Sequence, residues 1–140
     1  MLRAVIDTNV ILSGLQSNAG RSYELLTKLY QDAFIPVVSV PLVLEYEEVM
    51  NRHLVPDILS ISDVDDFIDY FCKVSDKVTI HYLWRPVLKD PFDDHILELA
   101  ISAGSKYIVT YNLKDFIGAE QFGIVALPPG DFIRIIEEAS

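Results

Sequence analysis

The sequence predicts an α/β fold in which helices cover both faces of a parallel β-sheet. Apolar stretches of strand length alternate along the 140 residues with segments of helical periodicity, and this alternation is typical of a parallel sheet. The strand-like stretches are nearly unbroken runs of aliphatic residues, as expected of strands that are buried on both faces. With 51% hydrophobic residues, the chain can bury one core, so we expect a single domain over residues 1–140.

The N-terminal part of the chain supplies two strands and two helices. Residues 2–7, "LRAVID", have the pattern of a buried strand, and a helix is expected to follow it through about Gly14. A second helical pattern covers 21–32. The stretch "AFIPVVS" (33–39) has the β-branched residues of a second strand.

The middle of the chain is mostly helical. Pro41 favours the start of a helix that runs to about Arg52. Residues 56–75 predict one or two further helices, with Ser62 as the expected N-cap of "DVDDFIDYFCKV". The β-branched stretch "VTIHY" (78–82) predicts a short third strand.

In the C-terminal part of the chain, predicted helices and strands again alternate. A helix is expected over 90–103, strands over 106–110 and 123–127, and a closing helix over 129–139. Five strands in all are therefore predicted.

The charge balance is strongly acidic, with 21 Asp and Glu against 11 Lys and Arg and a formal net charge of −10. Nucleic-acid-binding proteins usually have a basic surface, so this balance argues against nucleic acid unless metal ions or a local basic patch intervene. Acidic excess favours divalent cations or a basic protein partner. No stretch approaches the roughly 20 apolar residues of a membrane span, and no signal-peptide pattern is visible. We therefore expect a cytoplasmic protein.

Polar residues follow two of the predicted strands. Asp7 closes the first strand and is followed by Thr8 and Asn9. Parallel sheets bind ligands beyond the carboxyl ends of their strands, which favours a functional role for Asp7. Alternatively, Asp7 or Asn9 caps the next helix. A similar set of polar residues, Thr110, Asn112 and Asp115, follows the fourth strand. Turn and capping roles explain some of these residues.

Glu45 lies on a face of its predicted helix that is otherwise apolar. Leu42 and Tyr46 share this face at helical spacing. A carboxylate on a buried face needs a cation or a metal ion as partner, which favours a functional role. The alternatives are a salt bridge with Arg52 or another base, or a position at the exposed edge of the apolar stripe.

The stretch "KDPFDDHILELA" (89–100) places three carboxylates where a helix begins. Asp90 followed by Pro91 has the order of an N-cap and a first helical residue. Asp93 is then third in the helix, a position from which an acid can support the cap, and it also lies on the apolar face. Asp94 lies about 100° further round the helix.

These residues together predict a metal site at one edge of the sheet, where Asp7, Glu45 and Asp93 would meet Asn112 or Asp115. Clustered carboxylates repel one another, and the usual compensation is a hard divalent cation such as Mg²⁺ or Mn²⁺. A glycine-rich phosphate loop is absent. A zinc site is not predicted, because the histidines are scattered and expected in surface or packing positions: His53, His81 and His95.

The sequence around these residues resembles the PIN domain family, metal-dependent ribonucleases that include many toxins of bacterial and archaeal toxin–antitoxin pairs. The resemblance spans nearly the whole chain and is strongest to the VapC-like toxin components. It implies a three-layer α/β/α sandwich with a central parallel sheet of about five strands and an acidic metal pocket. It rests on four blocks in this order: "VIDTNVILSGL", "SVPLVLEYEEVMNR", "RPVLKDPFDDHILELAISAG" and "KYIVTYNLKDF".

The resemblance also implies roles for individual residues. The fourth acid of the family falls on Asn112, so Asp94 or Asp115 would have to supply the charge that binds a second metal ion. The implied catalytic set is Asp7, Glu45, Asp93 and Asn112, and the implied metal ligands are Asp7, Asp93 and Asp94. The residues implied in supporting roles are Thr8, Asn9, Thr110 and Asp115.

The implied function is a Mg²⁺- or Mn²⁺-dependent endoribonuclease that cleaves single-stranded RNA and leaves 3′-hydroxyl and 5′-phosphate ends. Single-stranded or structured RNA and a small antitoxin protein are the implied partners; a homodimer is compatible with the resemblance, and the oligomeric state stays open. A receiver-type phosphoacceptor would need an acidic pair after the first strand, and a haloacid-dehalogenase-type phosphatase would need Asp where Asn9 stands. A non-catalytic RNA- or protein-binding PIN-like module with a degraded metal site remains an alternative.

Overall fold

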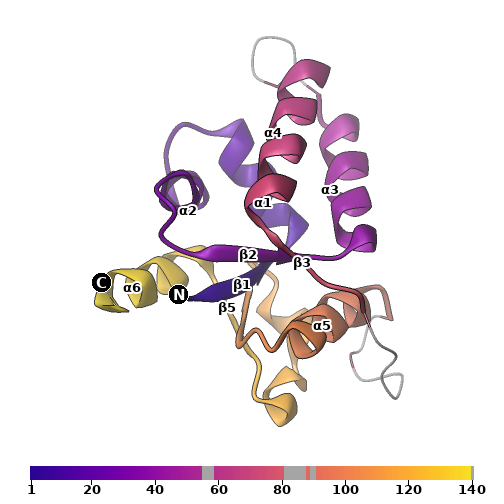
Figure 1. Cartoon of the computed structure of the whole chain (residues 1–140), viewed down its shortest axis with the longest axis vertical. Coiled ribbons are helices and arrows are strands. Elements are labelled where there is room, and N and C mark those ends of the chain that lie inside the picture. Colours follow the sequence, from indigo (N-terminus) through magenta and orange to yellow (C-terminus); the bar gives the residue numbers. More distant parts are fainter. Residues whose placement is uncertain (55–58, 81–87, 89–90, 140) are drawn as a thin grey trace.

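A five-stranded parallel sheet forms the centre of the part of the chain that the structure describes. The structure is a computed structural model that describes residues 1–54, 59–80, 88 and 91–139. The strand order is β3-β2-β1-β4-β5, and each neighbouring pair is parallel (Figure 1). The predicted parallel sheet is confirmed. Its strands are β1 (Arg3–Ile6), β2 (Ile35–Val38), β3 (Asp76–Lys77), β4 (Tyr107–Val109) and β5 (Val125–Leu127).

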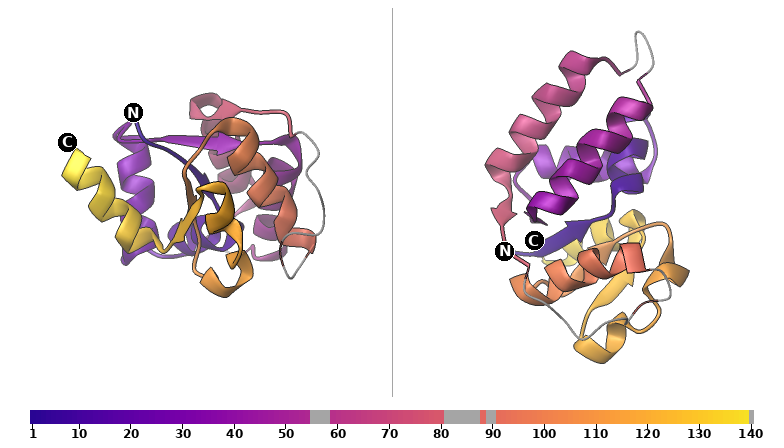
Figure 2. Two further views of the ribbon diagram at one scale, coloured as in Figure 1. Left: turned by 90° about the horizontal axis from the view of Figure 1, so that it is seen from below. Right: turned by 90° about the vertical axis from the view of Figure 1, so that its right-hand side faces the viewer.

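Helices cover the sheet on both faces, which gives the predicted α/β/α arrangement (Figures 1 and 2). One face carries α1 (Thr8–Gln16), α2 (Arg21–Tyr30), α3 (Val40–Arg52) and α4 (Ile61–Val74). The opposite face carries α5 (Pro91–Ala103), and α6 (Pro129–Ala139) packs against α2. Two short 3₁₀ helices, η1 (Leu113–Phe116) and η2 (Ala119–Phe122), lie between β4 and β5. None of the helices within the described ranges is long and apolar enough to cross a membrane.

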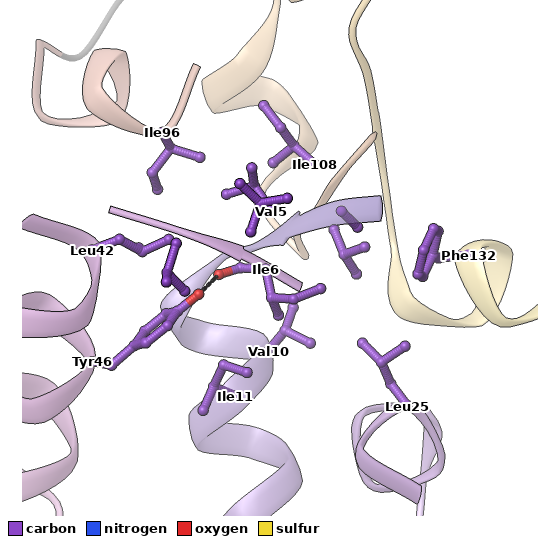
Figure 3. Packing of buried hydrophobic residues seen from close by; sticks show 14 of the residues in the cluster. Val5, Ile6, Val10, Ile11, Leu25, Leu42, Tyr46, Ile96, Ile108 and Phe132 are labelled. Atoms are coloured by element: carbon purple, nitrogen blue, oxygen red, sulfur yellow. Dashed lines mark hydrogen bonds between the residues drawn. The ribbon is translucent and has the colours of Figure 1, made fainter. Parts of the chain in front are cut away.

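The core lies between the central strand and the two helical layers. Ala4, Val5 and Ile6 of β1 are almost completely buried, as expected of a strand with neighbours on both sides and helices on both faces. On the α3 side, Tyr46 is fully buried, and its hydroxyl donates a hydrogen bond to the carbonyl of Ile6 (Figure 3). This bond joins α3 to the last residue of β1.

The third strand lies earlier in the chain than predicted. We expected it at 78–82, but β3 covers only Asp76–Lys77, and residues 81 and 82 lie outside the described ranges. The register pairs Val38, the last residue of β2, with Lys77. One further bond follows within the described ranges, from the Val78 N–H to the Val38 carbonyl at 2.8 Å. The length of β2 therefore ends the pairing, although the residues after it are the more apolar ones.

The cap of α4 also differs from the prediction. Ser60, and not Ser62, is the N-cap: its hydroxyl accepts from the Asp63 N–H at 3.1 Å, and the Asp63 carboxylate accepts from the Ser60 N–H at 3.0 Å. Both serines have an Asp three residues later, so the local capping signal does not distinguish them. The earlier start adds backbone bonds such as that from the Val64 N–H to the Ser60 carbonyl at 3.1 Å.

Candidate metal and catalytic centre at the carboxyl edge of the sheet

The carboxyl ends of β1 and β4 lie at the point where the chain connections diverge. From β1 the chain leads through α1 and α2 to β2 on one side, and from β4 it leads to β5 on the other. Open parallel sheets form their ligand crevice at such a point. Asp7 directly follows β1, and Thr110 directly follows β4. The Asp7 N–H donates to the carbonyl of Val109 at 2.8 Å, which holds the two ends together.

Asp7 is a buried carboxylate with two hydrogen-bond donors. Only 8% of the residue is exposed. One oxygen, Oδ1, accepts from the Thr8 N–H at 2.8 Å, and the other, Oδ2, accepts from the Thr110 hydroxyl at 2.7 Å. Asp7 is also the N-cap of α1, so the capping interpretation is confirmed for this residue. The bond to Thr110, contributed from the far end of the chain, is not explained by capping.

Burial raises the pKa of the Asp7 carboxyl group above its ordinary value. The bonds from Thr110 and Thr8 lower this pKa, and the negative charges of Glu45 and Asp115 raise it further. The net shift is upward, so desolvation and like charge outweigh the two donors. A cation at this edge would relieve both unfavourable effects.

Glu45 extends from α3 toward the same edge. Its Oε2 accepts a hydrogen bond from the Thr8 hydroxyl, and its Oε1 lies 3.3 Å from Nε2 of His95. The bond from His95 is the largest influence on the Glu45 carboxyl group and lowers its pKa, while burial opposes the shift. Arg52, the partner considered from the sequence, lies instead 3.7 Å from Glu48 on the surface of the helix. The base that contacts Glu45 in the structure is instead His95, and this contact is a salt bridge only when the imidazole is protonated.

Sequence reasoning missed His95. This residue was expected at the surface or in packing, but it joins α5 to Glu45 across the carboxyl edge of the sheet. Its position two residues after Asp93, near the start of α5, was the only local signal. Sequence position alone does not determine which face of α5 is directed toward α3, so the contact of His95 with Glu45 could not be inferred from it.

The acidic start of α5 is confirmed, with Asp93 and Asp94 in its first turn. Asp93 is half-buried. Asp94 is almost fully buried, and its Oδ1 accepts from the N–H of Leu88 at 3.0 Å. One oxygen of Asp94 therefore binds the backbone before the helix. The predicted cap, Asp90, lies outside the described residues.

The segment after β4 contributes Thr110 directly and Asn112 through its backbone. The Asn112 N–H donates to the Thr110 hydroxyl oxygen at 2.9 Å, and the Asn112 carbonyl accepts from the Asp115 N–H at 3.0 Å. The Asn112 residue is exposed, whereas Asp115 is half-buried and close enough to raise the Asp7 pKa. Asn9, also considered from the sequence, is exposed. Of the two acids considered as substitutes for Asn112, Asp94 and Asp115, Asp115 is the one whose charge raises the Asp7 pKa.

The donors at this edge are carboxylates and hydroxyls, which are the ligands that hard divalent cations prefer. Among the described residues, no three His, Cys, Asp or Glu side chains lie close enough together to hold a metal ion. Mg²⁺ usually keeps several waters and takes only one or two carboxylates from the protein. The raised pKa of Asp7 beside two further acids is the charge pattern that such a cation would neutralise. The donor chemistry therefore fits a divalent cation.

The comparison with known families agrees with this geometry. A family model described as PIN domain matches residues 3–114, which include β1, α3, α5 and β4 and the residues after β4 as far as Lys114. No curated protein matches the chain. PIN domains are in general nucleases that use divalent metal ions. Because the match covers most of its length, the chain belongs to the PIN domain family.

Proposed function

We propose that this protein is a divalent-metal-dependent endoribonuclease that cleaves phosphodiester bonds of single-stranded RNA. The observation that carries the proposal is the buried carboxylate of Asp7 between β1 and β4. It is hydrogen-bonded to Thr110 and Thr8 and lies near the charges of Glu45 and Asp115. A buried, mutually repelling set of acids costs stability, which is expected where a site is kept for chemistry.

Asp7 and Asp93, with Asp94, are the residues that would hold Mg²⁺ or Mn²⁺. The bound ion supplies charge neutralisation at the scissile phosphate and a lowered pKa for a bound water. Thr110 and the Thr8 N–H fix the orientation of the Asp7 carboxylate before the ion arrives. Preorganised ligands of this kind reduce the reorganisation needed during the reaction.

Glu45 is the proposed group that orients the attacking water. Each of its oxygens accepts one hydrogen bond, from Thr8 or from His95, and each keeps lone-pair capacity for a further donor. A lowered pKa keeps this carboxyl group ionised, as an acceptor of a water proton must be. Asn112 and Asn9, both exposed, are proposed to contact the RNA backbone or bound water, and Asp115 to supply the charge that Asn112 lacks.

The biological role we propose is the toxin of a toxin–antitoxin pair, VapC-like, acting as a single PIN-like domain in the cytoplasm. The support is the resemblance of the four sequence blocks together with the family match. A small antitoxin protein is the proposed partner. Induced expression should arrest growth, and co-expression of a small neighbouring reading frame should restore it. Growth unaffected by expression of an active nuclease would favour RNA maturation instead.

Cleavage of a labelled single-stranded RNA tests the biochemical proposal. We expect cleavage with millimolar Mg²⁺ or Mn²⁺, none with EDTA, and products with 5′-phosphate ends. Asp66→Asn, which changes an exposed acid on α4, is the matched control and should cleave like the wild type. RNA binding without cleavage in either metal would instead support the non-catalytic module with a degraded metal site.

A further inference from the structure

The Glu45 carboxylate is held at both oxygens by donors from two different helices. Thr8, the first residue of α1, donates to Oε2, and His95, on α5, contacts Oε1 through Nε2 at 3.3 Å. Because α1 and α3 cover one face of the sheet and α5 the other (Figure 1), the His95 contact joins the two helical layers above the carboxyl edge. A single donor would let the carboxylate rotate about that bond, whereas two donors fix its plane.

The protonation of the imidazole follows from its partner. An ionised carboxylate only accepts hydrogen bonds, so Nε2 of His95 must carry the proton in this contact. The other ring nitrogen, Nδ1, is buried and has no hydrogen-bond partner among the described residues. In the neutral ring, Nδ1 is then an acceptor without a donor.

This arrangement does not serve stability well. The side chains of His95 and Glu45 are 22% and 35% exposed, and electrostatic interactions between partly exposed groups are weakened by solvent. A buried polar atom without a partner is unfavourable. Within the described part of the chain, Nδ1 of His95 thus has no partner, while Nε2 is directed at Glu45.

We infer that His95 is a positioning residue: with Thr8, it fixes the plane of the Glu45 carboxylate at the carboxyl edge where Asp7 lies. The inference rests on the proposed nuclease function for its effect on rate, but the contact itself exists in the metal-free protein. His95 acts through Glu45 and is not proposed to touch RNA or metal.

Kinetics of three variants test the effect on rate. His95→Ala removes the donor and should lower kcat roughly 10- to 100-fold, the usual range for residues that orient a functional group, with KM changed less than about twofold. His95→Gln keeps an N–H donor and should recover part of the loss. In a Glu45→Gln background, His95→Ala should cause no further loss, because the residue that it positions has already lost its function.

His53 provides the matched control. It is an exposed histidine at the C-cap of α3, and its Nδ1 lies 2.8 Å from the carbonyl of Val49. His53→Gln should leave kcat and KM unchanged. Additive losses for His95→Ala and Glu45→Gln, or an equal loss in His95→Gln and His95→Ala, would overturn the inference.

A second measurement does not need activity. Nitrogen-15 NMR of the imidazole rings in the metal-free protein should show His95 as the Nε2–H tautomer, with a proton that exchanges slowly with solvent. Glu45→Ala should accelerate this exchange and leave the signals of His53 unchanged. An Nδ1–H tautomer in the wild type, or an exchange rate insensitive to Glu45→Ala, would contradict the contact.

The two measurements separate the proposals. If the wild type cleaves no RNA, the proposed function fails, and the NMR result still decides whether His95 holds Glu45. If the wild type cleaves RNA and His95→Ala, folded as judged by its circular dichroism, cleaves equally fast, only the positioning inference fails.

Discussion

The end of β1 and the second turn of α3 each bring a carboxylate to the same edge of the sheet, but their surroundings shift the two pKa values in opposite directions. Asp7 is buried between β1 and β4, and burial raises its pKa even though two donors bind it. Glu45 is half-exposed, and the contact with His95 lowers its pKa. The two donors to Asp7 do not offset its burial and the nearby negative charges, whereas the bond from His95 lowers the Glu45 pKa more than burial raises it.

The difference teaches which environment suits which role. The Asp7 carboxylate is buried among like charges and is unfavourable until a cation arrives, although two donors bind it. The donors to Glu45 outweigh its burial, so this carboxylate is ionised and oriented in advance. Pairs of acids whose environments separate their pKa values often divide the work of a site. In the proposed nuclease, Asp7 is accordingly the metal ligand and Glu45 the water-orienting group.

The largest expected effect is a loss of nuclease activity, which distinguishes the metal-binding role of Asp7 from the water-orienting role of Glu45. Asp7→Asn and Asp93→Asn should each lower kcat/KM at least ~100-fold, because each removes a negative charge from the metal site. Glu45→Gln should lower kcat by a similar factor. Raising the Mn²⁺ concentration should recover part of the Asp7→Asn loss, which is a loss of metal affinity, and none of the Glu45→Gln loss.

Cleavage rates measured over a series of Mn²⁺ concentrations check this prediction. The exposed acid Asp66 again provides the control, as Asp66→Asn should follow the wild-type curve. Recovery of both Asp7→Asn and Glu45→Gln by metal would assign Glu45 to the ligands and remove the distinction.

The next effect concerns the thermal response to metal. An ion that binds only the folded state stabilises it by RT ln(1 + [L]/Kd), about 2.7 kcal/mol at a hundredfold excess over Kd. The melting temperature of the wild type should rise as Mn²⁺ is added, and that of Asp7→Asn should rise far less. Melts with EDTA and with millimolar Mn²⁺ provide the measurement, and an equal rise in both proteins would place the metal elsewhere.

Without metal, the two carboxylates should affect stability with opposite signs. In Asp7→Asn the amide oxygen can still accept from Thr8, and the amide N–H can donate to Thr110, while the repulsion from Glu45 disappears. Its free energy of unfolding should therefore equal or exceed that of the wild type. Glu45→Gln loses an ionised acceptor and should be less stable, by under about 1 kcal/mol because the group is partly exposed.

The pH dependence of these differences gives the sharper test. The pKa of Asp7 is raised on folding, so its favourable contribution exists below the unfolded-state pKa, about 4, and is lost as the pH rises through the folded-state pKa. The pKa of Glu45 is lowered, so its contribution exists above its unfolded-state pKa, about 4.3, and is lost as the pH falls through the folded-state pKa.

Urea unfolding with EDTA between about pH 3.5 and pH 7 measures both contributions. Relative to the wild type, Asp7→Asn should gain stability as the pH rises, and the deficit of Glu45→Gln should shrink as the pH falls. Parallel pH curves for the wild type and both variants would show that neither shift is coupled to folding.

The same two regions show how far the sequence alone can lead. The meeting of Asp7 and Thr110 was predictable, because the carboxyl ends of parallel strands share one edge. The direction of Glu45 followed from its spacing to Leu42 and Tyr46, both of which are buried. These inferences need only the helical periodicity of the sequence around Glu45 and the parallel arrangement of the strands.

What was not predictable depends on distances between elements. The contact of His95 with Glu45 requires the separation and rotation of α3 and α5 on opposite faces of the sheet, which no local pattern encodes. The short β3 follows from where β2 ends, so the β-branched residues 78–80 did not define the strand. Either serine could have capped α4, and the first backbone hydrogen bonds of the helix decided in favour of Ser60 over Ser62.

The smallest expected effect tests whether the partner of Glu45 is His95 and not Arg52. Arg52 was the base considered from the sequence, but it lies 3.7 Å from Glu48, and both side chains are more than half exposed. An exposed pair four residues apart on a helix contributes about 0.3–0.5 kcal/mol, so Arg52→Gln should lower the free energy of unfolding by no more than that. Because Arg52 does not bind Glu45, kcat should be unchanged, and the NMR signals of His95 should not move. A fall in kcat together with a shift of the His95 signals would mean that Arg52 reaches Glu45 in solution. A rise in KM alone would assign Arg52 to an RNA phosphate, and the Glu45–His95 pair would stand.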